Sequence, residues 1–523
     1  MIRIITSLVA VLTVVSAHSQ PVLKETPKLV VGITIDQLRG DYLNLFQHTF
    51  TERGFKRLLN EGLVYQNMTF DFPNLNSAAA IATIYTGANP FYHGIVNDKK
   101  YSSQKATEIP FFNDDAFLGN YTQDKLSPAA LKVSTITDEL KLASQGFSDV
   151  YSFAPDASLA LITAGHAANC AYWVEDYTGK WATTTYYKDF HWVVDKENRS
   201  GTFSNYVGSL SWKPALPVEN YKAFPYTTNR TSFQHLFNSY LQVKKSPLVN
   251  ENVRNTSMQL LEKAEMGKRL NPDFLALTFY LGSYPNSVDK TYSLEIQDAY
   301  VRLDRELSLL LDNIDKTVGL KNTLIFVTST GYYDSEETYP AGLKMPGGVF
   351  YTNRCEALLN MYLMALYGKE QWVEKLYDKQ IYLNRKLIQD KNLNLEEVQS
   401  KAAEFVVEFS GVQDAVTSVQ LLNGRANDNM AHYKNIMNRD VCGDIFVEIQ
   451  PGYKIVDERE MLKSERRERE PAVVAPVIFF GNGIKSEKIK RTIKATEIAP
   501  TISHVLRIRP PNAAKSQILS EFL

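Results

Sequence analysis

Short, almost wholly apolar runs alternate along the chain with segments whose apolar residues recur at helical spacing. The apolar runs are typical of strands that are buried on both faces of a parallel sheet. They lie at Leu29–Asp36, Val150–Ala154, Phe274–Leu281, Thr323–Thr328 and Val473–Phe480. The helical segments lie at Thr51–Glu61, Ser127–Ser144 and Ser293–Ile314. This alternation predicts an α/β fold with a mostly parallel central sheet, helices on both faces, and ligands bound at the carboxyl ends of the strands.

Two long segments interrupt the alternation, at about Tyr186–Pro272 and Tyr332–Glu470. Both are rich in Tyr, Asn, Lys and Glu, and we expect them to be insertions that form cap elements above the sheet. The predicted organisation is therefore a signal at 1–19 and one domain at 20–523, with insertions at about 186–272 and 332–470.

The first residues, Met1–Ser19, combine Arg3 with an apolar core from Ile4 to Val15 and small residues before Gln20. This core is too short to span a bilayer and is typical of a cleavable secretory signal. We expect export to the periplasm or an outer-membrane-associated location. No later stretch is apolar enough to predict a transmembrane segment.

Charge and cysteine content exclude several classes of protein. The 523 residues carry a formal net charge of -1, which gives no electrostatic basis for binding nucleic acid. The three cysteines, Cys170, Cys355 and Cys442, form no C-x-x-C pair, which excludes a zinc ribbon or a thioredoxin-type site and allows at most one disulfide.

The one strong charge block, Asp457–Glu470, alternates in sign and predicts a solvated connector or a docking segment for an envelope partner.

The stretch Pro73–Gly94 carries the candidate chemistry. Turn-forming residues lead to Ser77, and the small and apolar run Ala78–Tyr85 then predicts a helix. Ser77 has two possible roles at this helix start. It caps the helix, or its hydroxyl is placed at the anion-binding end of the helix, where a nucleophile would stand.

These residues, together with Lys28–Tyr42, carry a resemblance to the alkaline phosphatase superfamily. Asp36, Ser77, Ile84–Gly87, His93–Ile95 and Asn97 match a metal-binding Asp, a Thr or Ser nucleophile, an I-Y-T-G segment and an H-G-I turn followed by Asn. The chain resembles the bacterial periplasmic phosphatases that are related to type I phosphodiesterases and nucleotide pyrophosphatases. Further similar segments are Ala164–Trp173, Ser246–Val253, Tyr382–Val398, Ile449–Tyr453 and Thr496–Asn512. The resemblance implies an alkaline-phosphatase-like sandwich.

The resemblance also implies two zinc ions held by six protein ligands, and here the chain departs from the family. Asp36 stands at the first ligand position. The other five positions carry residues that do not ligate zinc in such sites, namely Phe279, Ser283, Thr330, Gly331 and Val474. A single carboxylate cannot hold a zinc pair, so we expect no cofactor.

The phosphate-binding side differs as well. Asp156 and Ser158 stand where the resemblance implies Lys and Arg, and a carboxylate there repels a phosphoryl group. Asn97 is either a phosphate contact or a turn residue. His93 and His166 are expected to be structural.

Two further hypotheses concern what occupies the altered site. Asp334, Glu336 and Glu337 are candidates for a rebuilt metal site, although no two of the eight histidines lie within ten residues of each other. Alternatively, aromatic side chains fill part of the vacated volume and leave Asp36 beside Ser77. These aromatic residues are Phe279, Tyr280, Tyr284, Tyr332 and Tyr333.

The sequence thus predicts an exported, alkaline-phosphatase-like protein that has lost hydrolase activity and acts as a binding or scaffolding component of the cell envelope, with an envelope protein as partner. One alternative is an active, Zn²⁺-dependent phosphomonoesterase or phosphodiesterase that uses Ser77 as nucleophile. Another is a binder of a phosphate- or sulfate-like anion at the Ser77 helix start, without turnover.

Overall fold

The computed structural model describes residues 25–188, 190–201, 203, 207–223, 232–282, 284, 293–331, 347–459, 466–467 and 475–523. The predicted signal Met1–Ser19 lies outside the described residues. Within the described part of the chain, no helix combines the length and apolar character needed to cross a membrane.

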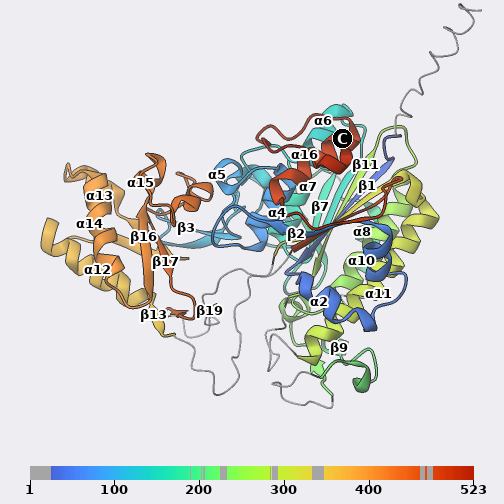
Figure 1. Cartoon of the computed structure of the whole chain (residues 1–523), viewed down its shortest axis with the longest axis horizontal. Helices are drawn as coiled ribbons and strands as arrows, with labels where there is room; N and C mark the ends of the chain where they lie inside the picture. The colour runs from blue at the N-terminus through green and yellow to red at the C-terminus, as the bar shows by residue number, and fades with distance from the viewer. Residues whose placement is uncertain are drawn as a thin grey trace, which may run out of the picture.

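An eleven-stranded sheet forms the centre of the molecule (Figure 1). Its strands, in spatial order, are β21 (Glu487–Ile489), β2 (Leu63–Thr69), β20 (Ala475–Gly481), β12 (Thr323–Ser329), β1 (Leu29–Asp36), β11 (Asp273–Tyr280), β6 (Val150–Ala154), β7 (Cys170–Val174), β8 (Trp181–Thr184) and β5 (Gly119–Asn120), with β22 (Ile493–Lys494) beside β2. The strands β12, β1, β11, β6 and β7 run parallel to one another. The predicted α/β fold with a mostly parallel sheet is confirmed.

Helices cover both faces of this sheet (Figure 1). One face carries α8 (Trp192–Ser200), α10 (Leu248–Lys263) and α11 (Leu294–Thr317). The other face carries α4 (Ser77–Thr86), α6 (Ile136–Ala143), α7 (Ala157–Ala164) and α16 (Ile498–Leu506). Every residue of β1 is buried, as a strand between two helical layers requires.

The strand register brings the candidate site together. Asp36, the last residue of β1, pairs with Tyr280 at the end of β11. On the other side, Ile35 pairs with Ser329 at the end of β12, so Thr330 follows directly beside Asp36. Parallel strands end at one edge of a sheet, and ligands of such folds bind at that edge.

A second unit lies beside the central one and has a hydrophobic core of its own, which includes Leu359, Trp372 and Val447. Its antiparallel sheet contains β14 (Val373–Tyr377), β15 (Gln380–Leu383), β17 (Ile445–Ile449) and β16 (Val412–Thr417). Its helices are α12 (Thr352–Tyr367), α13 (Arg385–Asp390) and α14 (Leu395–Val407). This core lies inside the predicted insertion at 332–470. The boundaries of this insertion and of the one at 186–272 stay predictions.

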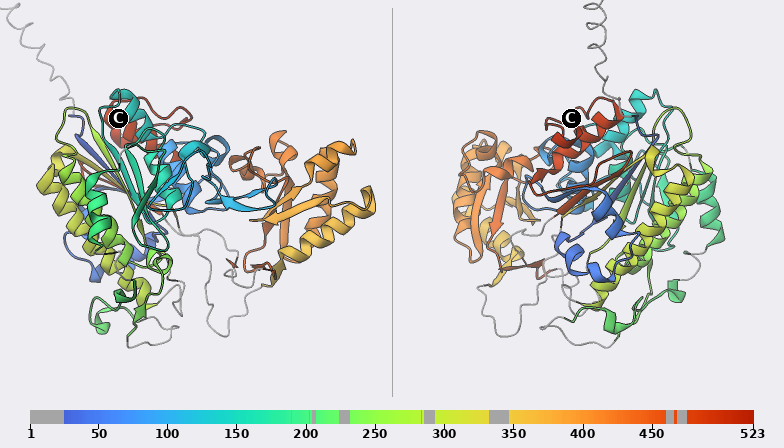
Figure 2. Two further views of the ribbon diagram at one scale, coloured as in Figure 1. Left: turned by 180° about the vertical axis from the view of Figure 1, so that it is seen from behind. Right: turned by 45° about the vertical axis from the view of Figure 1, so that its right-hand side comes forward.

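The hairpin of β3 (Lys99–Ser102) and β4 (Thr107–Pro110) reaches from the central unit to this second unit (Figure 2). The rings of Tyr101 and Tyr382 meet there with centroids 5.0 Å apart. β3 begins at Lys99, shortly after the candidate site residue Asn97. The hairpin therefore connects the candidate site to the second unit.

Three local predictions differ from the structure. The run at Val473–Phe480 forms β20, which is antiparallel to both neighbours, because two-sided burial sets the apolar pattern but not the strand direction. The helix predicted at Ser127–Ser144 begins only at Ile136, where Thr135 and Asp138 form a capping box. The helix predicted at Thr51–Glu61 begins at Phe55, because the Asp304 carboxylate accepts hydrogen bonds from the backbone of Thr51 and Phe55, both at 2.7 Å.

The three cysteines are all free and buried. The disulfide that the sequence allowed is therefore not formed in the structure.

Candidate functional site

Ser77 and Thr330 both donate hydrogen bonds to the same carboxylate oxygen of Asp36. The Ser77 hydroxyl contacts Asp36 Oδ1, and Thr330 Oγ1 lies 2.9 Å from that atom. Thr330 also accepts a hydrogen bond from the backbone N–H of Gln37 at 2.9 Å. Thr330, the residue that follows β12, thus supplies a second hydroxyl donor to the carboxylate of Asp36.

The cap of α4 is Asn76 rather than Ser77. Asn76 Oδ1 accepts a hydrogen bond from Ala79 N at 3.0 Å, and Asn76 Nδ2 donates to Val96 O at 2.8 Å. Ser77 is the first helical residue, so the interpretation of Ser77 as the helix cap is wrong. Asn76 satisfies the helix start, and the Ser77 hydroxyl points at Asp36.

Asp36 is 3% exposed. Its burial raises the pKa of the carboxyl, while the nearby charge of Lys245 and the hydroxyl donors of Ser77 and Thr330 act in the opposite direction. The carboxyl is therefore a desolvated group whose charged form is stabilised by the charge of Lys245 and by the hydroxyls of Ser77 and Thr330.

Two lysines from outside the parallel core enter the site. Lys244, the last residue of α9 (Tyr240–Lys244), lies 2.8 Å from Asp156 and 2.6 Å from Asp176, and Lys245 lies 3.2 Å from Asp156. Burial alone would raise the pKa of Asp156, but the two ammonium groups outweigh it and hold that pKa well below its usual range. Asp156, whose carboxylate was expected to repel a phosphoryl group, is therefore ionised and held in ion pairs with both lysines.

These lysines are functional candidates that sequence reasoning missed. The two lysines are adjacent in the chain but lie far from Asp36 in sequence. Only the fold shows that both pair with Asp156, on the loop after β6. The ring of Tyr280 lies under Lys245, with the ammonium 5.0 Å from the ring centroid.

Asn97 lies on the wall of the same site but faces the second unit. Its Nδ2 donates to Asp378 Oδ2 at 3.0 Å. Asp378 and Lys379 connect β14 to β15 through a tight turn with positive φ angles of 46° and 60°. The role of Asn97 as a phosphate contact stays a prediction.

The aromatic residues expected to fill the site are buried but do not all face it. Phe279, Tyr280 and Tyr284 are at most 5% exposed. Tyr284 packs on His235 and Trp212, with centroids 4.7 and 5.4 Å away. The ring of Tyr280 contacts a charged residue of the site, namely Lys245. Tyr332 and Tyr333 lie outside the described residues.

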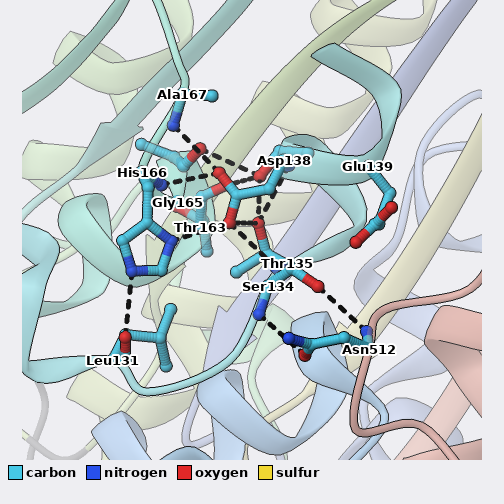
Figure 3. Close-up of polar contacts among 12 residues, drawn as sticks. Leu131, Ser134, Thr135, Asp138, Glu139, Thr163, Gly165, His166, Ala167 and Asn512 are labelled. Carbon is cyan, nitrogen blue, oxygen red and sulfur yellow. Dashed lines mark hydrogen bonds and ion pairs between the residues drawn. The ribbon is translucent and has the colours of Figure 1, made fainter. Parts of the chain in front are cut away.

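His166 and His93 are engaged in contacts away from Asp36. The Nδ1 and Nε2 atoms of His166 each lie 2.9 Å from an acceptor, Asp138 Oδ2 and Leu131 O respectively (Figure 3). His93 is fully buried, its Nδ1 accepts a hydrogen bond from Ile95 N at 3.1 Å, and burial lowers its pKa to about 3. Both residues hold turns in place, as the sequence predicted.

A cavity of about 690 Å³ opens over Ser77 and Asp36. Its walls come from the loops after β1 and β6, the start of α4, the β3–β4 hairpin, α9 and the β14–β15 turn. Among the lining residues are Asn74, Asn97, Asp98, Trp173, Lys244 and Asp378. The position agrees with the ligand site expected at the carboxyl ends of the strands.

The family model described as type I phosphodiesterase / nucleotide pyrophosphatase matches residues 30–472. The chain belongs to this family. Its relatives include a protein named calcium-transporting ATPase from Myroides odoratus, which is 29% identical over 519 residues and aligns over 93% of each chain. Alkaline phosphatase PhoV of Synechococcus elongatus is 28% identical over 527 residues, covering 95% of this chain and 93% of PhoV.

Alkaline phosphatase PafA of Elizabethkingia meningoseptica is 26% identical over 529 residues, with 95% of this chain and 94% of PafA aligned. The crystal structure of PafA superposes with a TM-score of 0.82 at 25% identity and covers 95% of this chain and 99% of PafA. The predicted membership of the alkaline phosphatase superfamily and the predicted fold are confirmed.

The described residues of this phosphodiesterase-family site do not fit a zinc pair. Phe279 is wholly buried in β11, and the hydroxyl of Thr330 donates a hydrogen bond to Asp36 Oδ1. Within the described ranges, no three His, Cys, Asp or Glu side chains are grouped so that they could hold a metal ion. Ser283, Val474 and the candidate acids Asp334, Glu336 and Glu337 lie outside these ranges.

Proposed function

We propose that this member of the phosphodiesterase family binds a ligand or partner in the bacterial cell envelope and does not hydrolyse phosphate esters. The observation that carries the proposal is the hydrogen bonding of Asp36 by Ser77 and Thr330. In this arrangement, two neutral hydroxyl groups contact the carboxylate at the end of β1, and the charge of Lys245 lies near it.

Phosphoryl transfer in a two-metal site depends on cations that stabilise the attacking and leaving oxygens. Here the Ser77 hydroxyl donates to a carboxylate, and Lys244 and Lys245 are both paired with Asp156. The proposal holds that these paired ammonium groups do not replace the two metal ions of such a site. The sequence of Met1–Ser19 supports export, and we place the protein in the periplasm or at the outer membrane.

A hydrolysis assay tests this proposal. The purified protein is assayed with 4-nitrophenyl phosphate and bis(4-nitrophenyl) phosphate at several concentrations of added Zn²⁺, with PafA as the positive control. We expect turnover by PafA and none above the buffer background by this protein. Zinc-dependent turnover that Ser77→Ala abolishes would overturn the proposal and would favour a metal site rebuilt from residues such as Asp334.

A further inference from the structure

Three carboxyl groups from separate segments line the cavity over Ser77. Asp36 ends β1, Asp98 precedes β3, and Asp156 precedes α7. Burial raises the pKa of Asp36 and of Asp98, and the negative charge of Asp156 acts in the same direction on both. The three groups therefore lie close enough to repel one another. Carboxylates in such surroundings require positive charge nearby.

Lys245 supplies positive charge to all three carboxyl groups. Its ammonium lies 3.2 Å from Asp156 Oδ2 and 5.0 Å from the centroid of the Tyr280 ring. Tyr280 pairs with Asp36 in the register of β11 and β1, which places the ammonium beside the end of β1. Burial raises the pKa of Asp36, and the charge of Lys245 is the largest influence that lowers it. The same charge lowers the pKa of Asp98 against the larger effect of burial.

Lys244 holds this arrangement in place. Its ammonium lies 2.8 Å from Asp156 and 2.6 Å from Asp176, and its side chain is 5% exposed. The two acids follow β6 and β7, so Lys244 fixes the end of α9 against two loops at the carboxyl edge of the sheet. Lys245 follows as the last, capping residue of α9 and is thereby held at the cavity wall.

A divalent metal ion that entered this site would need the same carboxylates. Ions such as Mg²⁺ and Mn²⁺ are bound by one or two carboxylates together with water molecules. The ammonium of Lys245 already compensates the carboxyl groups available for this, and two positive charges at close range repel each other. The poor fit of this site to a zinc pair therefore has a second cause, namely a cation that belongs to the chain.

We infer that Lys245 is the resident counter-ion of this site and that it keeps divalent metal ions away from Asp36. The inference rests on the proposed function, because a two-metal hydrolase needs the ions that Lys245 excludes. The ammonium compensates the charge of the carboxyl groups and does not activate Ser77, whose hydroxyl donates to Asp36.

Binding of Mn²⁺ to the purified protein at pH 7 tests the inference, with the electron paramagnetic resonance signal of the free ion as the measure. We expect Lys245→Met to bind Mn²⁺ at least about tenfold more tightly than the wild-type protein, because the repelling charge is gone. Lys245→Arg keeps the charge and should bind as weakly as the wild type. The double variant Lys245→Met/Asp36→Asn should lose the gain.

Lys401→Met is the matched control, because Lys401 lies on α14 outside the cavity lining and pairs with Glu404. It should leave Mn²⁺ binding unchanged. The Lys245 side chain is 34% exposed, so its variants should fold, which circular dichroism checks, and Lys245→Gln serves as a second neutral variant.

An equal gain of Mn²⁺ binding by Lys401→Met would indicate diffuse surface attraction and would overturn the inference. Tight binding by the wild-type protein that Asp36→Asn removes would also overturn it. If neither Lys245→Met nor Lys245→Gln gains Mn²⁺ binding, the inference is wrong but the proposed function stands, because only turnover in the aryl phosphate assay would overturn that function.

Discussion

The hydroxyl of Ser77 donates its hydrogen to Oδ1 of Asp36, and this contact joins the start of α4 to the end of β1. Ser77, which the sequence predicts to stand at the nucleophile position, therefore acts as a hydrogen-bond donor to a buried carboxyl group. Thr330 supplies a second donor to the same oxygen from the end of β12. Together these contacts link the end of β1 to the start of α4 and to the end of β12.

Removing the Ser77 hydroxyl should therefore destabilise the fold. Hydrogen bonds to charged groups contribute about 1.5–3 kcal/mol, and we expect Ser77→Ala to lower the free energy of unfolding by an amount in this range. Urea denaturation at pH 7 measures the change. Ser158→Ala, at another serine of the cavity wall, is the matched control and should change stability by less than about 0.5 kcal/mol. An unchanged midpoint for Ser77→Ala would contradict a structural role for this contact.

Lys244 should be more important for stability than its neighbour Lys245. Its buried ammonium is shared between Asp156 and Asp176, whose side chains are 30% and 45% exposed, so its removal should cost about 1–3 kcal/mol. Lys245 is 34% exposed in its side chain, and its loss should cost about 1 kcal/mol or less. Thermal and urea denaturation of Lys244→Met and Lys245→Met measure the two effects, and equal losses would show that the pairing is misassigned.

The contact between His166 and Asp138 predicts a dependence of stability on pH (Figure 3). Burial tends to lower the pKa of His166, but the Asp138 carboxylate and Leu131 O raise it above its ordinary value. The folded state therefore binds the proton more tightly than the unfolded state. This stabilisation is complete below about pH 6.5 and is lost as the pH rises through the pKa of the folded state.

Unfolding free energies measured from pH 5.5 to 8.5 test this, with His166→Gln as the variant. We expect the wild-type protein to lose about 1 kcal/mol relative to His166→Gln as the pH rises across this range. Parallel pH profiles for the two proteins would mean that His166 does not carry the effect.

The three cysteines should be unreactive in the native protein. All are buried and free, and burial raises the pKa of Cys355 and Cys442 to about 12. A thiol must ionise to react, so Ellman's reagent at pH 8 should detect no thiol before unfolding and three after it. Addition of dithiothreitol should leave the melting temperature unchanged. A lower melting temperature in reductant would reveal a disulfide.

Five strands of the eleven-stranded sheet were predicted from the sequence, because burial on both faces leaves an apolar signal. β1 and β6 have the predicted bounds, and β11 and β12 differ from them by one residue at their ends. Strand direction leaves no such signal, so the antiparallel course of β20 was not predictable. Helix starts that depend on a distant side chain, such as the Asp304 cap of α3, were equally hidden.

The candidate site was predictable only in part. The motif around Asp36 and Ser77 located it. That Phe279 and Thr330 stand at metal-ligand positions of the family stays a prediction. The pairing of Lys244 and Lys245 with Asp156, and of Asn97 with Asp378, was not predictable, because these contacts join segments that only the tertiary structure brings together.

The metal content of the purified protein tests the central claim most directly. The full chain, purified without chelators and dialysed against buffer containing Zn²⁺ and then against metal-free buffer, is analysed by inductively coupled plasma mass spectrometry, with PafA treated in parallel. We predict much less than one equivalent of zinc per chain, unchanged in Asp36→Asn. Two equivalents of retained zinc that are lost in Asp36→Asn would contradict the account.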